Sequence, residues 1–216
     1  MSTHKYFHDN RNDQILIYVN GEILPRDKAK ISVFDSGFLL GDGVWEGIRF
    51  HNGHLVFIQE HLDRLFHGAS SLDIDIGVSE DRIKSLIISV LDANTMVTDI
   101  HIRLIVSRGL KKTPYQHPNA NIGESTIVII PEYKKADKTI NKKGISLATV
   151  SARRGTADTQ DPRLNTLSKL NCIFACIEAD KKGADEGLMK DVNGNVSTCN
   201  STNFFIIMEK EVWTST

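Results

Sequence analysis

The sequence predicts an α+β fold organised in two domains. Three observations lead to this expectation: short apolar runs typical of strands, two segments with helical spacing of apolar residues, and a polar, lysine-rich stretch inside the chain. The chain has 216 residues, 40% of them hydrophobic, which is enough for one large domain or two small ones with a real core. We expect a small N-terminal α/β domain over residues 1–131, a linker over 132–144 and a second domain over 145–216.

Hairpins and helices are both expected in the first domain. Asn20-Gly21 and Asn52-Gly53 each lie between two short apolar runs, which is the strongest short-range indication of a β-hairpin. Apolar residues at helical spacing predict helices within 59–74 and 80–95. Runs rich in β-branched residues predict two further strands, at 101–109 and 125–133.

The second domain is expected to begin with a strand at 145–152. Residues 166–184 predict a helix that ends near Gly183, with a core face made by Leu167, Leu170, Phe174 and Ile177. After this helix we expect a strand, an Asn-Gly turn, a second strand, an irregular loop and a hairpin. The last hairpin reaches Thr216 without a closing element, so we expect a C-terminally truncated open reading frame.

Charge and cysteine content exclude several classes of function. The formal net charge is −1, from 26 Lys+Arg and 27 Asp+Glu, which gives no global attraction to nucleic acid or to acidic membranes. No apolar run approaches the length needed to span a membrane, and the polar start has no signal-peptide core. The odd number of cysteines, 3, favours a reduced, cytoplasmic setting.

Basic residues after the first glycine-rich loop are candidates for anion binding. Arg49 lies on a predicted strand and Arg64 on the helix that follows, and guanidinium groups bind phosphate or carboxylate through paired hydrogen bonds. His51 and His54 flank the Asn52-Gly53 turn, but their spacing matches no zinc motif. We therefore predict an anion site and no metal site.

Two stretches resemble a known family, "GDGVWEGIR…HLDRL" and "KGADEGLMKDVNGNVSTCNSTNFFII". They are similar to the class IV (fold type IV) aminotransferases, which include branched-chain aminotransferase, D-amino-acid aminotransferase and aminodeoxychorismate lyase. The resemblance implies a small N-terminal domain and a larger C-terminal domain with a barrel-like sheet, incomplete in this sequence. It also implies a pyridoxal 5'-phosphate cofactor between the domains, a homodimer, and an amino acid and a 2-oxo acid as small-molecule substrates.

The resemblance also assigns individual residues. Arg64, in the family's H-x-x-R-L motif, is expected to hold the cofactor phosphate. Trp45 is expected to line the substrate pocket and Arg103 to receive substrate carboxylates, as in branched-chain enzymes. Thr198 stands where the family has the glutamate that pairs with the pyridine nitrogen, and a hydroxyl supplies no negative charge there. Asn203, in the next loop, is assigned to the cofactor site.

The position of the family's Schiff-base lysine is the main departure. Without a gap, the alignment places that lysine at Asn165, which cannot form an imine, and the nearest lysine is Lys169. If both residues lie on a helix, they share one face with β-carbons about 5–6 Å apart, within reach of a lysine side chain. Three alternatives stay open: the lysine has moved to Lys169, the alignment is shifted by a gap, or the lysine chemistry is lost.

The sequence therefore predicts a pyridoxal-phosphate-dependent aminotransferase of branched-chain type. In this interpretation Lys169 is both the catalytic residue and the covalent anchor of the cofactor. Asn165 and Thr198 favour one alternative, a non-catalytic scaffold of the same fold that binds a metabolite or cofactor without an imine. A carbon–carbon lyase resembling aminodeoxychorismate lyase is a further alternative.

Overall fold

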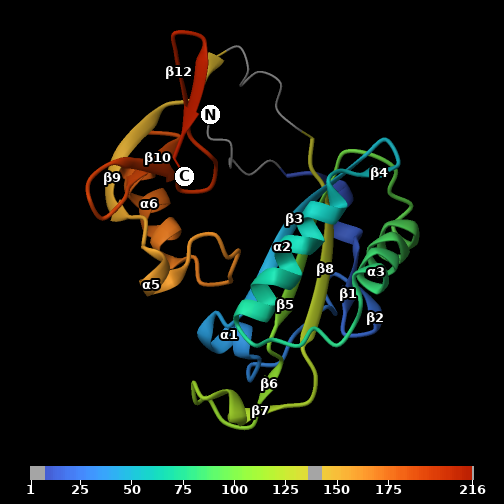
Figure 1. Ribbon diagram of the computed structural model, residues 1–216. Helices are drawn as coiled ribbons and strands as arrows, with labels where there is room; N and C mark the ends of the chain where they lie inside the picture. Colours follow the sequence, from blue (N-terminus) through green and yellow to red (C-terminus); the bar gives the residue numbers. More distant parts are fainter. Residues whose placement is uncertain (1–7, 136–142, 216) are drawn as a thin grey trace. The chain divides into compact units, whose positions relative to one another are not determined.

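The computed structural model describes residues 8–135 and 143–215, so residues 136–142 of the predicted linker lie outside the described part. The chain divides into two compact units, which are described one at a time. The larger unit contains the described residues 8–135 together with 164–168, and the smaller unit contains 143–163 and 169–215. Their mixture of helices and sheets confirms the α+β class (Figure 1). None of the helices in the described ranges is long and apolar enough to cross a membrane.

An antiparallel sheet forms the centre of the larger unit. Its six strands, all within residues 8–135, follow the order β2-β1-β8-β5-β3-β4. Both predicted hairpins are present, and the Asn and Gly of each turn have the positive φ that these tight turns require. The strands are β1 (Leu16–Val19), β2 (Glu22–Pro25), β3 (Gly43–His51), β4 (His54–Leu55), β5 (Ile100–Ser107) and β8 (Thr126–Tyr133).

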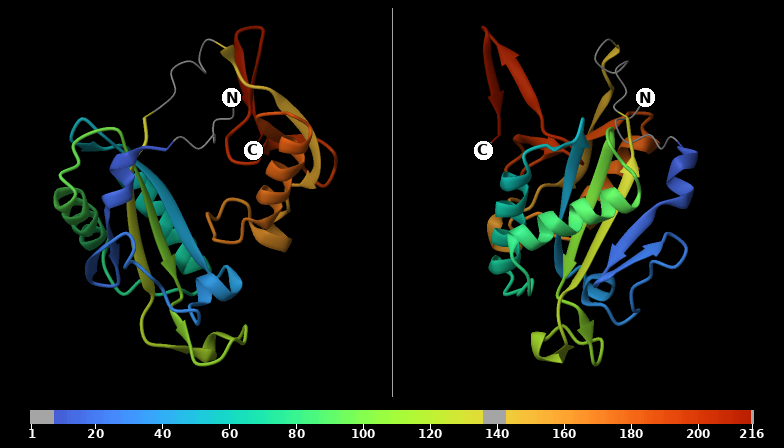
Figure 2. Two further views of the ribbon diagram at one scale, coloured as in Figure 1. Left: turned by 180° about the vertical axis from the view of Figure 1, so that it is seen from behind. Right: turned by 90° about the vertical axis from the view of Figure 1, so that its right-hand side faces the viewer.

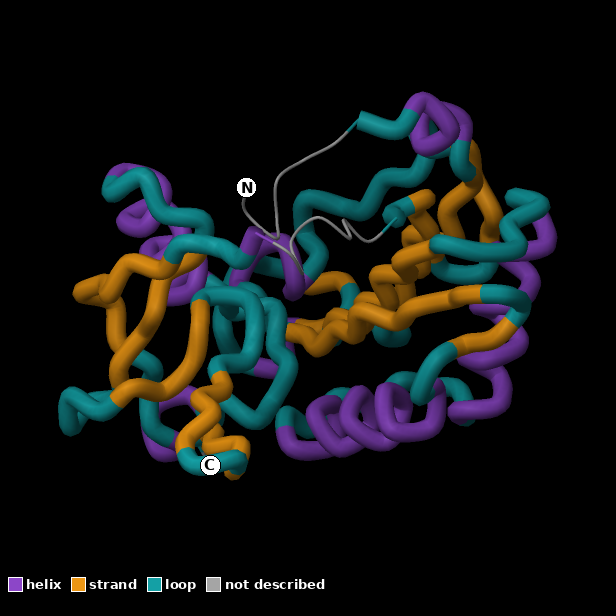
Figure 3. The backbone as a smooth tube through the Cα atoms, turned by 90° about the horizontal axis from the view of Figure 1, so that it is seen from above, coloured by secondary structure: helices purple, strands orange, loops and turns teal. Residues whose placement is uncertain are grey.

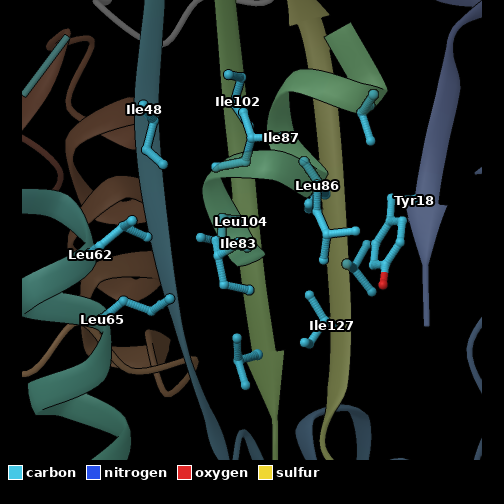
Figure 4. Packing of buried hydrophobic residues seen from close by; sticks show 14 of the residues in the cluster. Tyr18, Ile48, Leu62, Leu65, Ile83, Leu86, Ile87, Ile102, Leu104 and Ile127 are labelled. Carbon is cyan, nitrogen blue, oxygen red and sulfur yellow. The ribbon is translucent and has the colours of Figure 1, made fainter. Parts of the chain in front are cut away.

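Two amphipathic helices cover one face of this sheet, as Figure 3 shows for α2 (Ile58–Ser71) and α3 (Glu80–Ala93). Ser79 caps α3 by accepting a hydrogen bond from the backbone of Arg82. Successive strand residues point to opposite faces, so every second residue of β3 and β5 contributes to the core. Leucines and isoleucines of the helices pack on these strands. Figure 4 labels Leu62, Leu65, Ile83 and Ile87 of the helices and Ile48, Ile102 and Leu104 of the strands.

Short elements complete the larger unit. The 3-10 helix η1 (Asn10–Gln14) precedes β1, and α1 (Ser36–Leu40) precedes β3. The two-residue strands β6 (Leu110–Lys111) and β7 (Asn121–Ile122), with the 3-10 helix η2 (Pro118–Ala120), form a projection beyond one end of the sheet (Figure 2).

The smaller unit contains an open sheet with the order β11-β10-β9. The strands β9 (Leu147–Arg153) and β10 (Glu186–Lys190) are parallel, and the helix α6 (Leu170–Lys181) connects them. The strand β11 (Val196–Cys199) returns antiparallel to β10, and β12 (Phe205–Met208) and β13 (Glu211–Thr214) form a hairpin of their own. A single-turn helix, α5 (Ala157–Gln160), precedes α6.

Two expectations about the 166–184 helix are wrong. The helix begins only at Leu170, because residues 164–168 pair with β3 of the larger unit instead. Its predicted core face is also exposed, with Leu170 61% and Phe174 56% accessible, and the buried residues are Ala175 and Ala179. The helix α6 packs closely on β10, and this close approach requires small residues. A Cβ at Gly187 of β10 would lie only 2.8 Å from the Ala175 carbonyl oxygen.

Candidate active site

The residues predicted to form the site are divided between the two units. Trp45, Arg64 and Arg103 belong to the larger unit, where Asn165 also lies. Lys169, Thr198 and Asn203 belong to the smaller unit.

A buried carboxylate organises the basic residues of α2. Glu46 of β3 is fully buried on the helix-covered face of the sheet. Its carboxylate accepts hydrogen bonds from Nε and Nη2 of Arg64, both at 2.6 Å, and from Nδ1 of His61 at 2.7 Å. The bond to Glu46 raises the pKa of Arg64 above its ordinary value. Sequence reasoning missed Glu46, although a glutamate at a core-facing position of an alternating strand indicates a buried partner.

Arg64 can still bind an anion in this arrangement. A guanidinium carries five N–H donors, and only Nε and Nη2 face Glu46. Half of the side chain is exposed, so the other donors are available to an oxyanion. The remaining N–H donors of Arg64 are suited to the oxygen atoms of a phosphate group, and Glu46 keeps the guanidinium in one orientation.

Arg49 does not share this site, contrary to the sequence-based expectation. Its position on β3 puts it on the sheet face opposite to Glu46 and Arg64, because side chains alternate along a strand. Its Nη1 donates to the Lys134 carbonyl oxygen at 2.5 Å.

The open face of the sheet brings Trp45 and Arg103 together. The guanidinium carbon of Arg103 lies 3.8 Å from the centroid of the Trp45 ring, which is a cation–π contact. Burial lowers the pKa of Arg103, and Glu132 acts against this effect. Trp45 directly precedes Glu46 on β3, so this pair and the Arg64 site lie on opposite faces of the same strand.

His101 is a further residue of the open face that the sequence did not single out. It pairs with Arg49 across β3 and β5, and its Nε2 would lie 3.0 Å from a Cβ at Gly47. Burial, then the positive charges of Lys134, Arg103 and Arg49, lower its pKa to about 4. The ring is therefore neutral at pH 7.

An apolar hollow of about 350 Å³ lies on the same open face, next to these residues. Ile105, the partner of Trp45 in the β3–β5 register, forms part of its wall. Leu167 reaches the hollow from the segment that pairs with β3. The other apolar side chains of the lining are Ile17, Val19, Ala29, Ile31, Phe38, Val128 and Ile130.

Asn165 is bound to the edge of β3. Its backbone oxygen accepts from the Trp45 N–H at 3.0 Å, and its Nδ2 donates to the Trp45 carbonyl oxygen at 2.7 Å. Because Asn165 lies on an extended segment and Lys169 at the N-cap of α6, the expectation that one helical face carries both is wrong. Lys169 itself is half-buried.

Thr198 and Asn203 lie in and after β11. The Thr198 hydroxyl donates to the Thr202 carbonyl oxygen at 3.0 Å, and Asn203 is exposed in the loop that leads to β12. The buried Glu186 anchors this loop, because it accepts a hydrogen bond from the Thr202 hydroxyl at 3.1 Å. A threonine oxygen can accept a hydrogen bond from a ring nitrogen but cannot provide a counter-charge.

Among residues 8–135 and 143–215, no three His, Cys, Asp or Glu side chains gather in a way that could hold a metal ion. His51 instead lies 3.1 Å from both the Thr98 hydroxyl and the Asp99 carboxylate. The three cysteines are free thiols.

Comparison with known proteins agrees with this architecture. The family model "Amino-transferase class IV" matches residues 43–216. The branched-chain-amino-acid aminotransferase-like protein 1 of Arabidopsis thaliana is 38% identical over 196 residues, which are 91% of this chain and 35% of that protein. A D-alanine aminotransferase of Listeria monocytogenes is 26% identical over 201 residues, which cover 92% of this chain and 67% of that protein. The chain thus spans about a third of the length of the first relative and about two thirds of the second.

Solved structures show the same fold. The branched-chain amino acid aminotransferase of Escherichia coli aligns with a TM-score of 0.80, at 23% identity over 93% of this chain and 66% of that one. The branched-chain amino acid aminotransferase of Thermobaculum terrenum, solved in its pyridoxal-phosphate form, aligns with a TM-score of 0.78, at 18% identity over 94% of this chain and 67% of that one. From the family match over most of its length, this chain belongs to the class IV aminotransferases, a family that uses pyridoxal 5'-phosphate.

Proposed function

We propose that the protein transfers an amino group between a branched-chain-type amino acid and a 2-oxo acid, with pyridoxal 5'-phosphate as cofactor. The observation that carries this proposal is the Arg64 guanidinium, which Glu46 holds in one orientation while its other donors stay available to a phosphate. Family membership over residues 43–216 supports the reaction class. We also propose that the protein acts as a cytoplasmic homodimer, by analogy with its family.

Each proposed site residue has a distinct task. The cofactor supplies the electron sink of the reaction. Arg64 would bind its phosphate, and Lys169 would hold it covalently and, once freed, would accept the α-proton of the substrate. The Thr198 hydroxyl would form a hydrogen bond with the ring nitrogen, and Asn203 belongs to the loop beside it. Without a carboxylate at position 198, the ring would be a weaker electron sink than one paired with the family's glutamate.

The open face of the sheet supports an aliphatic substrate. Arg103 offers a guanidinium for a substrate carboxylate, and Trp45 stacks on this guanidinium. The neighbouring hollow of about 350 Å³ has an apolar lining, which suits a branched aliphatic side chain better than a polar one. These contacts favour a branched-chain substrate over a small or charged amino acid.

Borohydride trapping tests the proposal. We expect the protein, expressed from its complete gene and mixed with pyridoxal 5'-phosphate, to show a visible absorption band that borohydride bleaches, with the added mass on a Lys169 peptide. Lys169→Ala should abolish trapping. Lys181→Ala, a change at an exposed lysine of the same helix, should leave it intact. Trapping at other lysines only, or equal trapping in Lys169→Ala, would refute the role of Lys169.

A non-catalytic scaffold is the second candidate, and one observation favours it. The side chain at the family's lysine position, Asn165, is used in a hydrogen bond to the Trp45 carbonyl oxygen. A protein that binds the cofactor reversibly, and from which borohydride recovers no lysine adduct, would support this candidate.

A further inference from the structure

The segment 164–168 extends the sheet of the larger unit at the edge of β3. Thr166 and Val44 form an antiparallel bridge, and the Leu167 N–H donates to the Gly43 carbonyl oxygen at 2.9 Å. At this end of β3 the other edge is paired with β5, and Trp45 lies opposite Ile105. The segment therefore supplies the partner of β3 where β4 does not reach.

Trp45 is held by this segment through both its backbone and its side chain. The Asn165 backbone oxygen accepts a hydrogen bond from the Trp45 N–H, and its Nδ2 donates one to the Trp45 carbonyl oxygen. The indole Nε1 donates to the Thr166 carbonyl oxygen at 3.1 Å. The ring then stacks on Arg103. The orientation of the indole thus depends on where residues 165 and 166 lie.

The amide of Asn165 is chemically suited to this place. The short Asn165 side chain donates its amide N–H to the Trp45 carbonyl oxygen. At the same time the Asn165 backbone oxygen accepts the Trp45 N–H, so both backbone groups of Trp45 are hydrogen-bonded to one residue. An aspartate has the same shape, but its ionised carboxylate has no hydrogen to donate and would face the carbonyl oxygen. An alanine would leave the carbonyl without its side-chain donor.

We infer that Asn165 is a positioning residue for Trp45. By fixing the segment 165–167, it fixes the aromatic surface beside Arg103 and, through Leu167, one wall of the apolar hollow. In the alignment without a gap, the position of the family's lysine is used here to shape the substrate side of the site. The part of this inference that concerns substrate rests on the proposed function, whereas the part that concerns Trp45 does not.

Fluorescence of Trp45 tests the structural part. The chain has two tryptophans, Trp45 and Trp213, so Trp213→Phe leaves a single reporter. In that background, Asn165→Asp and Asn165→Ala should increase acrylamide quenching of Trp45 about twofold or more, because the indole loses its fixed hydrogen-bonded position. The matched control is Asn171→Asp: the Asn171 side-chain oxygen accepts from the Cys172 N–H at 2.8 Å, which an aspartate also does.

Kinetics on the protein from its complete gene test the substrate part. For a branched-chain amino acid, Asn165→Ala should raise KM about tenfold with kcat and trapping at Lys169 changed less than about twofold, because Trp45 contributes to binding. Unchanged quenching in both Asn165 variants would overturn the inference. Increased quenching with an unchanged KM would overturn its substrate part. Absence of trapping in the unmodified protein would refute the proposed function and leave the quenching result valid. If circular dichroism shows that Asn165→Asp is unfolded, Asn165→Ala decides.

Discussion

Replacing Glu46 by glutamine should destabilise the larger unit and release Arg64. Glu46 is fully buried and accepts three hydrogen bonds, two from Arg64 and one from His61. A hydrogen bond to a charged group contributes about 1.5–3 kcal/mol, and glutamine keeps one accepting oxygen while its NH2 faces the donors, so about two bonds are lost. Two such bonds together amount to about 3–6 kcal/mol. Because half of Arg64 is exposed and can be solvated again, we expect the lower end of this sum, about 3 kcal/mol.

Thermal and urea unfolding followed by circular dichroism measure this change in the free energy of unfolding. For a protein of this size, about 3 kcal/mol corresponds to a Tm lower by about 6–12 °C. Glu60→Gln, at an exposed position of α2, is the control and should change stability by less than about 0.5 kcal/mol. A double-mutant cycle with Arg64→Met should show coupling between the two sites. A loss below about 1 kcal/mol in Glu46→Gln, or no coupling, would show that the buried carboxylate does not hold Arg64.

Two pH-dependent effects follow from the shifted pKa values. Burial lowers the pKa of His101 from 6.5 to about 4, so the unfolded chain takes up this proton first and stability falls as the pH decreases from 6.5 through about 4. An NMR titration of the ring should give the low value, and His101→Gln should remove this part of the pH dependence. For Asp42, burial acts to raise the pKa, but the hydrogen bonds from Arg108 and Ser36 outweigh it and hold the pKa below 3.8. The stabilisation by this pair is fully present above pH 3.8 and is lost as the pH falls through the lower folded pKa, so acid unfolding of Asp42→Asn should depend less on pH in that range.

Local patterns predicted most of the larger unit, because its hairpins and helices are specified by neighbouring residues. An Asn-Gly pair selects a tight turn wherever it occurs between strands, and the periodic apolar residues of α2 and α3 lead to one buried face. The start of α6 was not predictable in this way. Residues 166–168 continue the helical spacing in the sequence, but long-range pairing with β3 overrides it.

In the candidate site, too, some features could be predicted from the sequence and others depend on long-range contacts. Trp45, Arg64 and Arg103 could be named as candidates from the sequence, and Trp45 and Arg103 do lie together. Their contact depends on the β3–β5 register, which places Gly47 opposite Arg103 and leaves room beside the Trp45 ring. Glu46 was missed because a buried acidic residue makes sense only when its distant partners, Arg64 and His61, are known. Which side chains share a face of the sheet, and which buried charges form pairs, can be recognised only from the three-dimensional structure.

The segment 164–168 also has a consequence for the order in which the protein can fold during synthesis. The backbone groups of β3 at residues 43–45 find their partner only after the ribosome has made the whole stretch that follows β8. A nascent chain that ends near residue 135 has all other strands of this sheet but keeps that edge open, and open edges pair readily with other chains. Residues 164–168 cover this edge once they have been made, so incomplete chains are open to association at residues 43–45 and longer chains are not.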